Sequence, residues 1–139
     1  MKIEKIGKIG WGQDGAIFGS ELFRLDHQGN CSVFDLEELQ KCDTAQINSI
    51  ATFELDKTDM IVPHSNSVCF GCDFYQKDDD YPLLYTNVYN NYASEDDRLL
   101  GVCCVYRIQR NGNSFKSELV QMIRMGFCED ATLWKACEE

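Results

Sequence analysis

The chain has 139 residues, of which 44% are hydrophobic, 12% are aromatic and two are proline. This length suits one domain, and the composition is that of a chain with a packed core, which excludes a disordered segment. The formal net charge of −10 disfavours nucleic acids and anionic lipid surfaces as partners, because both are recognised by clustered cations. We find no signal peptide and no apolar stretch approaching the ~20 residues of a membrane span, so we expect a cytoplasmic protein.

Alternation of apolar and polar residues dominates the first part of the chain, as it does in half-buried strands. The segment 26–30 is rich in turn-forming residues, and its Gly29 tolerates a positive φ, which predicts a hairpin between the flanking strands. One segment, 35–41, has good helix formers and an early acidic bias, and is predicted to form a turn or two of helix. The strands expected here are 15–19, 21–26, 31–36 and 50–56.

The second part of the chain repeats this pattern. The pair Asn111-Gly112 is the strongest hairpin marker in the sequence, because both residues tolerate positive φ. The tail from residue 129 is ambiguous: it is either a short helix capped by Asp130 or the beginning of another strand. The strands expected here are 67–71, 83–89, 100–109 and 115–125.

Each set of four strands is a short strand of small residues, a hairpin pair and a fourth strand, and the repeat is roughly 50 residues long, the scale of a propeller blade. We therefore expect an all-β fold of two consecutive four-stranded antiparallel blades of β-propeller type, with one short helix. The expected single domain, 1–139, divides into blade one (about 12–57), blade two (about 63–126) and a tail (127–139) that is a candidate start of a third blade. The alternative is a β-sandwich or barrel.

A closed propeller takes about 4–8 blades, and two blades leave apolar faces and strand edges without neighbours. Three explanations are open. The chain is a fragment that lacks further blades, it self-associates to cover those faces, or the eight strands form a sandwich or barrel instead.

Four segments of the chain carry a resemblance to known sequences: 63–71, 82–85, 105–108 and 119–123. By these segments the chain resembles uncharacterised bacterial β-propeller proteins of gut-associated species, over residues 62–134 and more weakly over 12–36. The resemblance implies an N-terminal two-blade portion of longer chains whose blades continue past residue 135. It implies no activity, so no functional residue carries over from it.

The chain contains eight cysteines, and without a secretion signal we expect mostly reduced thiols. Cys69 and Cys72 form a C-x-x-C pair, a spacing that lets two thiolates meet one zinc ion. The adjacent Cys103 and Cys104 do not complete such a site, because neighbouring strand residues point to opposite faces. Buried or incidental thiols are thus favoured over a metal site, which remains the weaker alternative.

A small-ligand site is the second possibility. Asp14 precedes the first strand of blade one, and His64 and Asn66 precede the first strand of blade two, where they would face a propeller's central channel. Turn capping explains the same residues, and is favoured. Tyr85, with Tyr89 and Tyr92, would stack on sugars or pack in the core. The acidic runs 78–80 and 95–97 lack the spacing and glycine of a calcium loop, so we interpret them as solvated loops.

No nucleophile elbow, phosphate-binding loop or dinucleotide fingerprint occurs, so an enzyme is not favoured and no cofactor is expected. The first hypothesis is a non-catalytic propeller-type unit for binding or assembly, whose partners are further blades or a second copy. The alternatives are a truncated piece of a carbohydrate-active or other small-ligand propeller, and a cysteine-based metal-binding domain.

Overall fold

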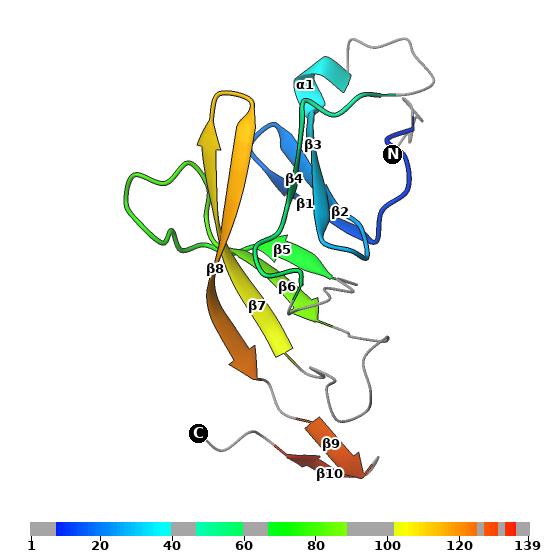
Figure 1. The fold of residues 1–139 in the computed structure, drawn as a ribbon, viewed down its shortest axis with the longest axis vertical. Coiled ribbons are helices and arrows are strands. Elements are labelled where there is room, and N and C mark those ends of the chain that lie inside the picture. Colours follow the sequence, from blue (N-terminus) through cyan, green and yellow to red (C-terminus); the bar gives the residue numbers. More distant parts are fainter. Residues whose placement is uncertain are drawn as a thin grey trace, which may run out of the picture.

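The computed structural model describes residues 8–39, 47–59, 67–88, 102–124, 127–130 and 133–135 of the chain. Nearly all regular structure in these ranges is antiparallel β-sheet (Figure 1). This β-sheet content confirms the all-β expectation. The described ranges contain no helix with the length and apolar character that crossing a bilayer requires.

The first four strands form one antiparallel sheet in sequence order, which we call sheet 1. The turn between β2 and β3 forms as expected: Gly29 has a φ of 85°, and the Asp26 carboxylate accepts the backbone N–H groups of Gln28 and Asn30. The strands of sheet 1 are β1 (Asp14–Phe18), β2 (Glu21–Leu25), β3 (Asn30–Asp35) and β4 (Ala51–Glu54).

The next four strands form a second sheet of the same type, sheet 2, again in sequence order. Its last two strands are the longest in the chain and form a hairpin with a bulge between Val105 and Tyr106. The strands of sheet 2 are β5 (Val68–Phe70), β6 (Leu84–Val88), β7 (Val102–Asn111) and β8 (Ser114–Arg124). All eight strands begin and end within two residues of the expected bounds.

The β7–β8 turn is tighter than the expected loop 110–114. Asn111 pairs with Ser114, so the loop consists of Gly112 and Asn113 alone. Only Gly112 has a positive φ, of 61°, and it stands at the first loop position, as in a type II′ turn.

The helix forms where expected but begins one residue later. Helix α1 spans Leu36–Leu39, and Asp35 ends β3 and caps the helix instead of belonging to it: its carboxylate accepts the N–H groups of Glu37 and Glu38. Residues 40 and 41 of the expected helix lie outside the described residues. The tail forms two short strands, β9 (Phe127–Asp130) and β10 (Leu133–Lys135), so the helical alternative is wrong there.

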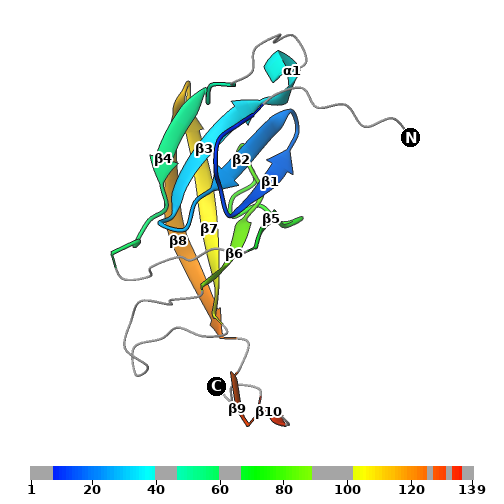
Figure 2. The same cartoon turned by 90° about the vertical axis from the view of Figure 1, so that its right-hand side faces the viewer.

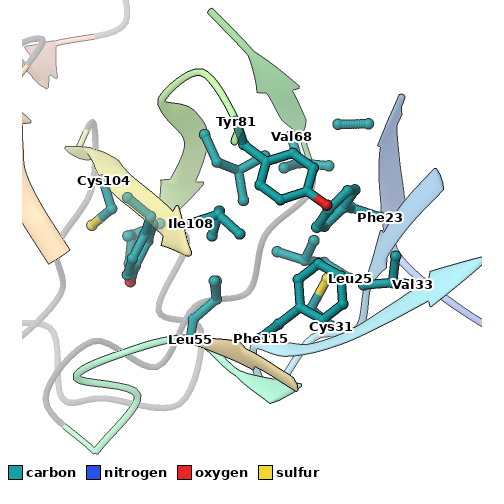
Figure 3. Close-up of a cluster of buried hydrophobic side chains, with 14 of the residues drawn as sticks. Phe23, Leu25, Cys31, Val33, Leu55, Val68, Tyr81, Cys104, Ile108 and Phe115 are labelled. Carbon is teal, nitrogen blue, oxygen red and sulfur yellow. The ribbon is translucent and has the colours of Figure 1, made fainter. Parts of the chain in front are cut away.

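Sheets 1 and 2 stack face to face across one core. Strand β1 lies beside β5 and β4 lies beside β8, so first strand meets first strand and fourth meets fourth (Figures 1 and 2). The β9–β10 hairpin forms a separate two-stranded sheet beyond the end of β8. The core between the large sheets is apolar, and Figure 3 shows part of it: Phe23, Leu25, Cys31, Val33, Leu55, Val68, Tyr81, Cys104, Ile108 and Phe115.

Aromatic rings dominate this core. Phe23 is fully buried and makes edge-on contacts with four rings, at centroid separations of 5.1 to 6.5 Å, two of them from the facing sheet. Such contacts contribute beyond the area they bury. Tyr81 comes from the loop between β5 and β6 and points into the core beside Phe23 (Figure 3). The four rings around Phe23 are Phe53, Phe70, Tyr81 and Phe115.

Candidate functional site

The residues predicted to face a ligand are only partly described. Asp14 is the first residue of β1, whereas His64 and Asn66 lie outside the described residues, as do Tyr89 and Tyr92. Whether Asp14, His64 and Asn66 converge therefore stays a prediction.

Asp14 joins the first strands of the two sheets. Its Oδ2 accepts the backbone N–H of Val68, the first residue of β5, at 2.8 Å, and its Oδ1 accepts the N–H of Gly15 at the same distance. Both carboxylate oxygens thus already have backbone donors. This geometry is the one expected if Asp14 is a capping residue, and it stabilises the sheet stacking.

Two further polar groups join the sheets at other places. At the β4–β8 side, the Asp56 N–H donates to Ser117 Oγ at 2.7 Å, and the Leu119 N–H donates to Asp56 Oδ2 at 3.1 Å. At the start of β2, Glu21 accepts hydrogen bonds from Tyr81 Oη at 2.5 Å and Arg110 Nη1 at 2.7 Å. We call these two groups and the Asp14 contact the three polar ties. Burial, together with the Glu21 contact, raises the pKa of Tyr81, which stays a neutral donor.

The C-x-x-C pair lies on the surface. Cys69 and Cys72 are both exposed free thiols, and no group of three or more His, Cys, Asp or Glu side chains within the described ranges is arranged to hold a metal ion. Cys31 and Cys104 are buried, and burial raises the pKa of both, that of Cys104 to about 11. These two thiols are therefore small core side chains rather than nucleophiles.

The acidic run 78–80 is only partly solvated, which corrects the sequence interpretation. Asp79 has a side chain 5% exposed and pairs with Arg107 of β7, Nη2 to Oδ1 at 2.6 Å. The backbone N–H of Gln76 also donates to Asp79 Oδ2 at 2.9 Å, and the Arg107 guanidinium lies over the Tyr75 ring. The hydrogen bonds from Arg107 hold the pKa of Asp79 below its ordinary value. Residues 95–97 lie outside the described residues.

Replacing Asp79 by asparagine should therefore destabilise the protein in a pH-dependent way. A carboxyl group with a depressed pKa contributes stability above its unfolded pKa, and that contribution is lost as the pH falls through the folded pKa. Urea unfolding at pH 7 should show a lower free energy of unfolding for Asp79→Asn than for wild type. The difference should shrink as the pH falls below the ordinary carboxyl pKa and vanish below the lower pKa that Asp79 has in the folded protein. Asp78→Asn, at an exposed position, is the control and should differ little from wild type at either pH. A difference for Asp79→Asn that does not change with pH would contradict the ion-pair assignment.

Sheet 2 presents a second, outward face. Cross-strand partners share a face, so six residues of sheet 2 lie together on the face that points away from sheet 1: Cys69, Tyr85, Asn87, Cys103, Val105 and Ile123. Cys69 and Ile123 are exposed, Val105 is 1% exposed, and the other three are partly exposed. We call these six residues the outer face of sheet 2.

The corresponding outer face of sheet 1 is covered around Phe34, whereas Ile17 of β1, on the same face, is 60% exposed. Phe34 of β3 points outward yet is only 2% exposed, because it packs with Ile9, Leu22, Leu36 and Ile47 in a small second cluster. The Arg24 guanidinium also lies over the Phe34 ring, at 5.2 Å. Beside Arg24 is a shallow hollow of about 200 Å³, lined by Ile9, Gly10, Gly12, Gln13, Asp14, Gly15 and Arg24.

No protein-family model matches this chain, and searches of curated proteins and of solved structures return no match either. The resemblance to uncharacterised bacterial propeller proteins therefore stays a prediction.

The sequence interpretation missed Arg24, Tyr81 and Arg107. The alternation of residues along β2 predicts that Arg24 lies on the face opposite Phe23. The sequence pattern does not predict the contact of Arg24 with residues 9–13, because that contact depends on the path of the chain before β1. Tyr81 lies in a loop without periodicity, so nothing in the pattern marks it as a core residue.

Proposed function

We propose that the chain is a non-catalytic, propeller-type unit for binding or assembly. In this proposal sheets 1 and 2 are neighbouring blades, and the outer face of sheet 2 receives one further β-sheet of the same four-stranded kind. The observation that carries the proposal is the stacking itself: two consecutive four-stranded meanders lie with first strand beside first strand and fourth beside fourth.

This stacking supports neighbouring blades over the alternatives. In an immunoglobulin-type sandwich, strands that follow each other in sequence are divided between the two sheets, and a barrel closes one sheet on itself. Here each sheet is built from four consecutive strands, and each keeps two edges. Propeller blades have this local, repeated order.

The outer face of sheet 2 supports a sheet as the partner. The inner face of the same strands already packs against sheet 1, through residues that alternate with those of the outer face. Ile123 and Cys69 leave apolar surface exposed on a pleated face, and such a face is complementary to another sheet at about 10 Å separation.

An association experiment tests this proposal. The purified chain should bind the apolar dye ANS at low concentration, and sedimentation velocity should show association as concentration rises and the face becomes covered. Ile123→Lys should weaken the association about tenfold or more, because burial of an isoleucine side chain is replaced by burial of a charge.

The adjacent residue offers a matched control. Met122 is 42% exposed and pairs with the inner-facing Cys104, so Met122→Lys makes the same kind of change on the opposite face. It should leave association unchanged. A monodisperse monomer that binds no ANS would overturn the proposal, and equal effects of the two lysine variants would overturn the choice of face.

A further inference from the structure

The N-terminal segment 8–13 lies across the outer face of sheet 1, and we call it the strap. Both of its ends are attached through the backbone. The Gln13 N–H donates to the Leu25 carbonyl at 2.7 Å, and the Ile47 N–H donates to the Lys8 carbonyl at 3.0 Å. Between these ends Ile9 packs against the cluster around Phe34. The strap therefore covers apolar surface that would otherwise be open to a neighbouring sheet.

Arg24 holds the middle of the strap. Its Nη1 donates to the Ile9 carbonyl, and its Nη2 donates to Ser32 Oγ at 2.9 Å on the neighbouring strand. The planar fork of a guanidinium suits this role, because it supplies two donors in fixed directions while its flat face stacks on Phe34. One side chain of β2 thus connects the strap, β3 and the apolar cluster.

Two glycines let the strap approach this closely. A Cβ added at Gly12 would lie 2.6 Å from Arg24 Cγ, and one added at Gly10 would lie 2.7 Å from Arg24 Nη1. Gly10 also has a φ of 82°, which side-chain-bearing residues rarely adopt. The strap backbone therefore rests directly on the Arg24 side chain, and any larger residue at position 12 must displace one of the two.

We infer that the strap is a built-in cap, locked by Arg24, which keeps the part of the outer face of sheet 1 around Phe34 closed to a second β-sheet. The identity of the docking partner, a second β-sheet, rests on the proposed function. The locking of the strap by Arg24 does not depend on it.

Hydrogen exchange tests the lock directly. Arg24→Met keeps the aliphatic packing but removes every donor, and Gly12→Ala keeps the Arg24 donors but forces the strap and the Arg24 side chain apart. In both variants the Gln13 and Ile47 amides should exchange about tenfold faster or more, while the Cys104 amide in β7 should keep its rate. Gly19→Ala is the control: Gly19 has a φ of 59° and no atom lies within 4 Å of an added Cβ, so it strains the backbone without touching the strap. Unchanged exchange at Gln13 and Ile47 in both variants would overturn the lock.

The docking part is tested with Ile123→Lys present, so that sheet 2 cannot contribute. Adding Arg24→Met or Gly12→Ala to this variant should increase ANS binding and restore concentration-dependent association through sheet 1. Faster exchange without new ANS binding or association would overturn the cap, because the strap would then cover no docking face. If wild type does not associate while the released strap exposes an ANS-binding face, the proposed function fails and the cap stands.

Discussion

Replacement of Phe23 by alanine should lower the free energy of unfolding by about 3–5 kcal/mol, the range for removal of a fully buried aromatic side chain. Phe23 is fully buried and touches four rings that come from both sheets and from the loop that carries Tyr81. The cavity would lie where the two sheets meet, so neither sheet alone can close it. A domain of this size is stable by roughly 5–15 kcal/mol, so the loss is a large fraction of the total.

Urea unfolding followed by far-UV circular dichroism measures this loss. Phe74→Ala is the matched control, because Phe74 is 44% exposed and lies edge-on to the ring of the partly buried Phe18. The control should cost about 1 kcal/mol or less. Similar losses for the two variants would mean that the sheets do not share one aromatic core.

Replacement of Asp14 by alanine should lower the free energy of unfolding by about 1–3 kcal/mol, because the Val68 and Gly15 N–H groups lose a charged acceptor. Asp14→Asn should cost less, since one carbonyl oxygen still accepts one of the two donors. The effect should concentrate where β1 meets β5, so hydrogen exchange of the Val68 amide should accelerate more than that of amides in β3.

Asp78→Ala is the control for Asp14→Ala, because it removes the same charge from an exposed position. It should change the free energy of unfolding by less than about 0.5 kcal/mol. The comparison also separates two roles for Asp14. A residue that only faces a ligand would leave stability unchanged when replaced, whereas a residue that joins two strands would not.

The strands were predictable because each one buries a single face. Alternation with period two marks such strands, and glycine-containing turns mark their ends, so all eight bounds follow from local pattern. The limits of local pattern are equally visible. Asp35 was placed inside the helix, but its carboxylate caps the helix, and sequence periodicity does not distinguish a cap from a first-turn residue.

The candidate site was less predictable than the strands. Asp14 and the C-x-x-C pair are identified by residue type and spacing. The hydrogen-bond donor to Asp14 from β5, however, depends on how the two sheets stack. The donor to Asp14 is 54 positions away along the chain, and the partner of Asp79 is 28 away. Contacts across such separations leave no periodic signal in one sequence, which is why Asp79 was interpreted as solvated and Arg24 was not identified.

The three polar ties have a consequence for which arrangements of the two sheets are permitted. An apolar interface of interlocking rings is only weakly directional, and one sheet sliding past the other by a strand's width would still bury hydrocarbon. Such a slide would separate Asp14, Asp56 and Glu21 from their donors and leave carboxylates unpaired beside the core. The core thus supplies most of the attraction between the sheets, while three acidic residues at separate places on their border select a single alignment among those that the attraction alone would allow.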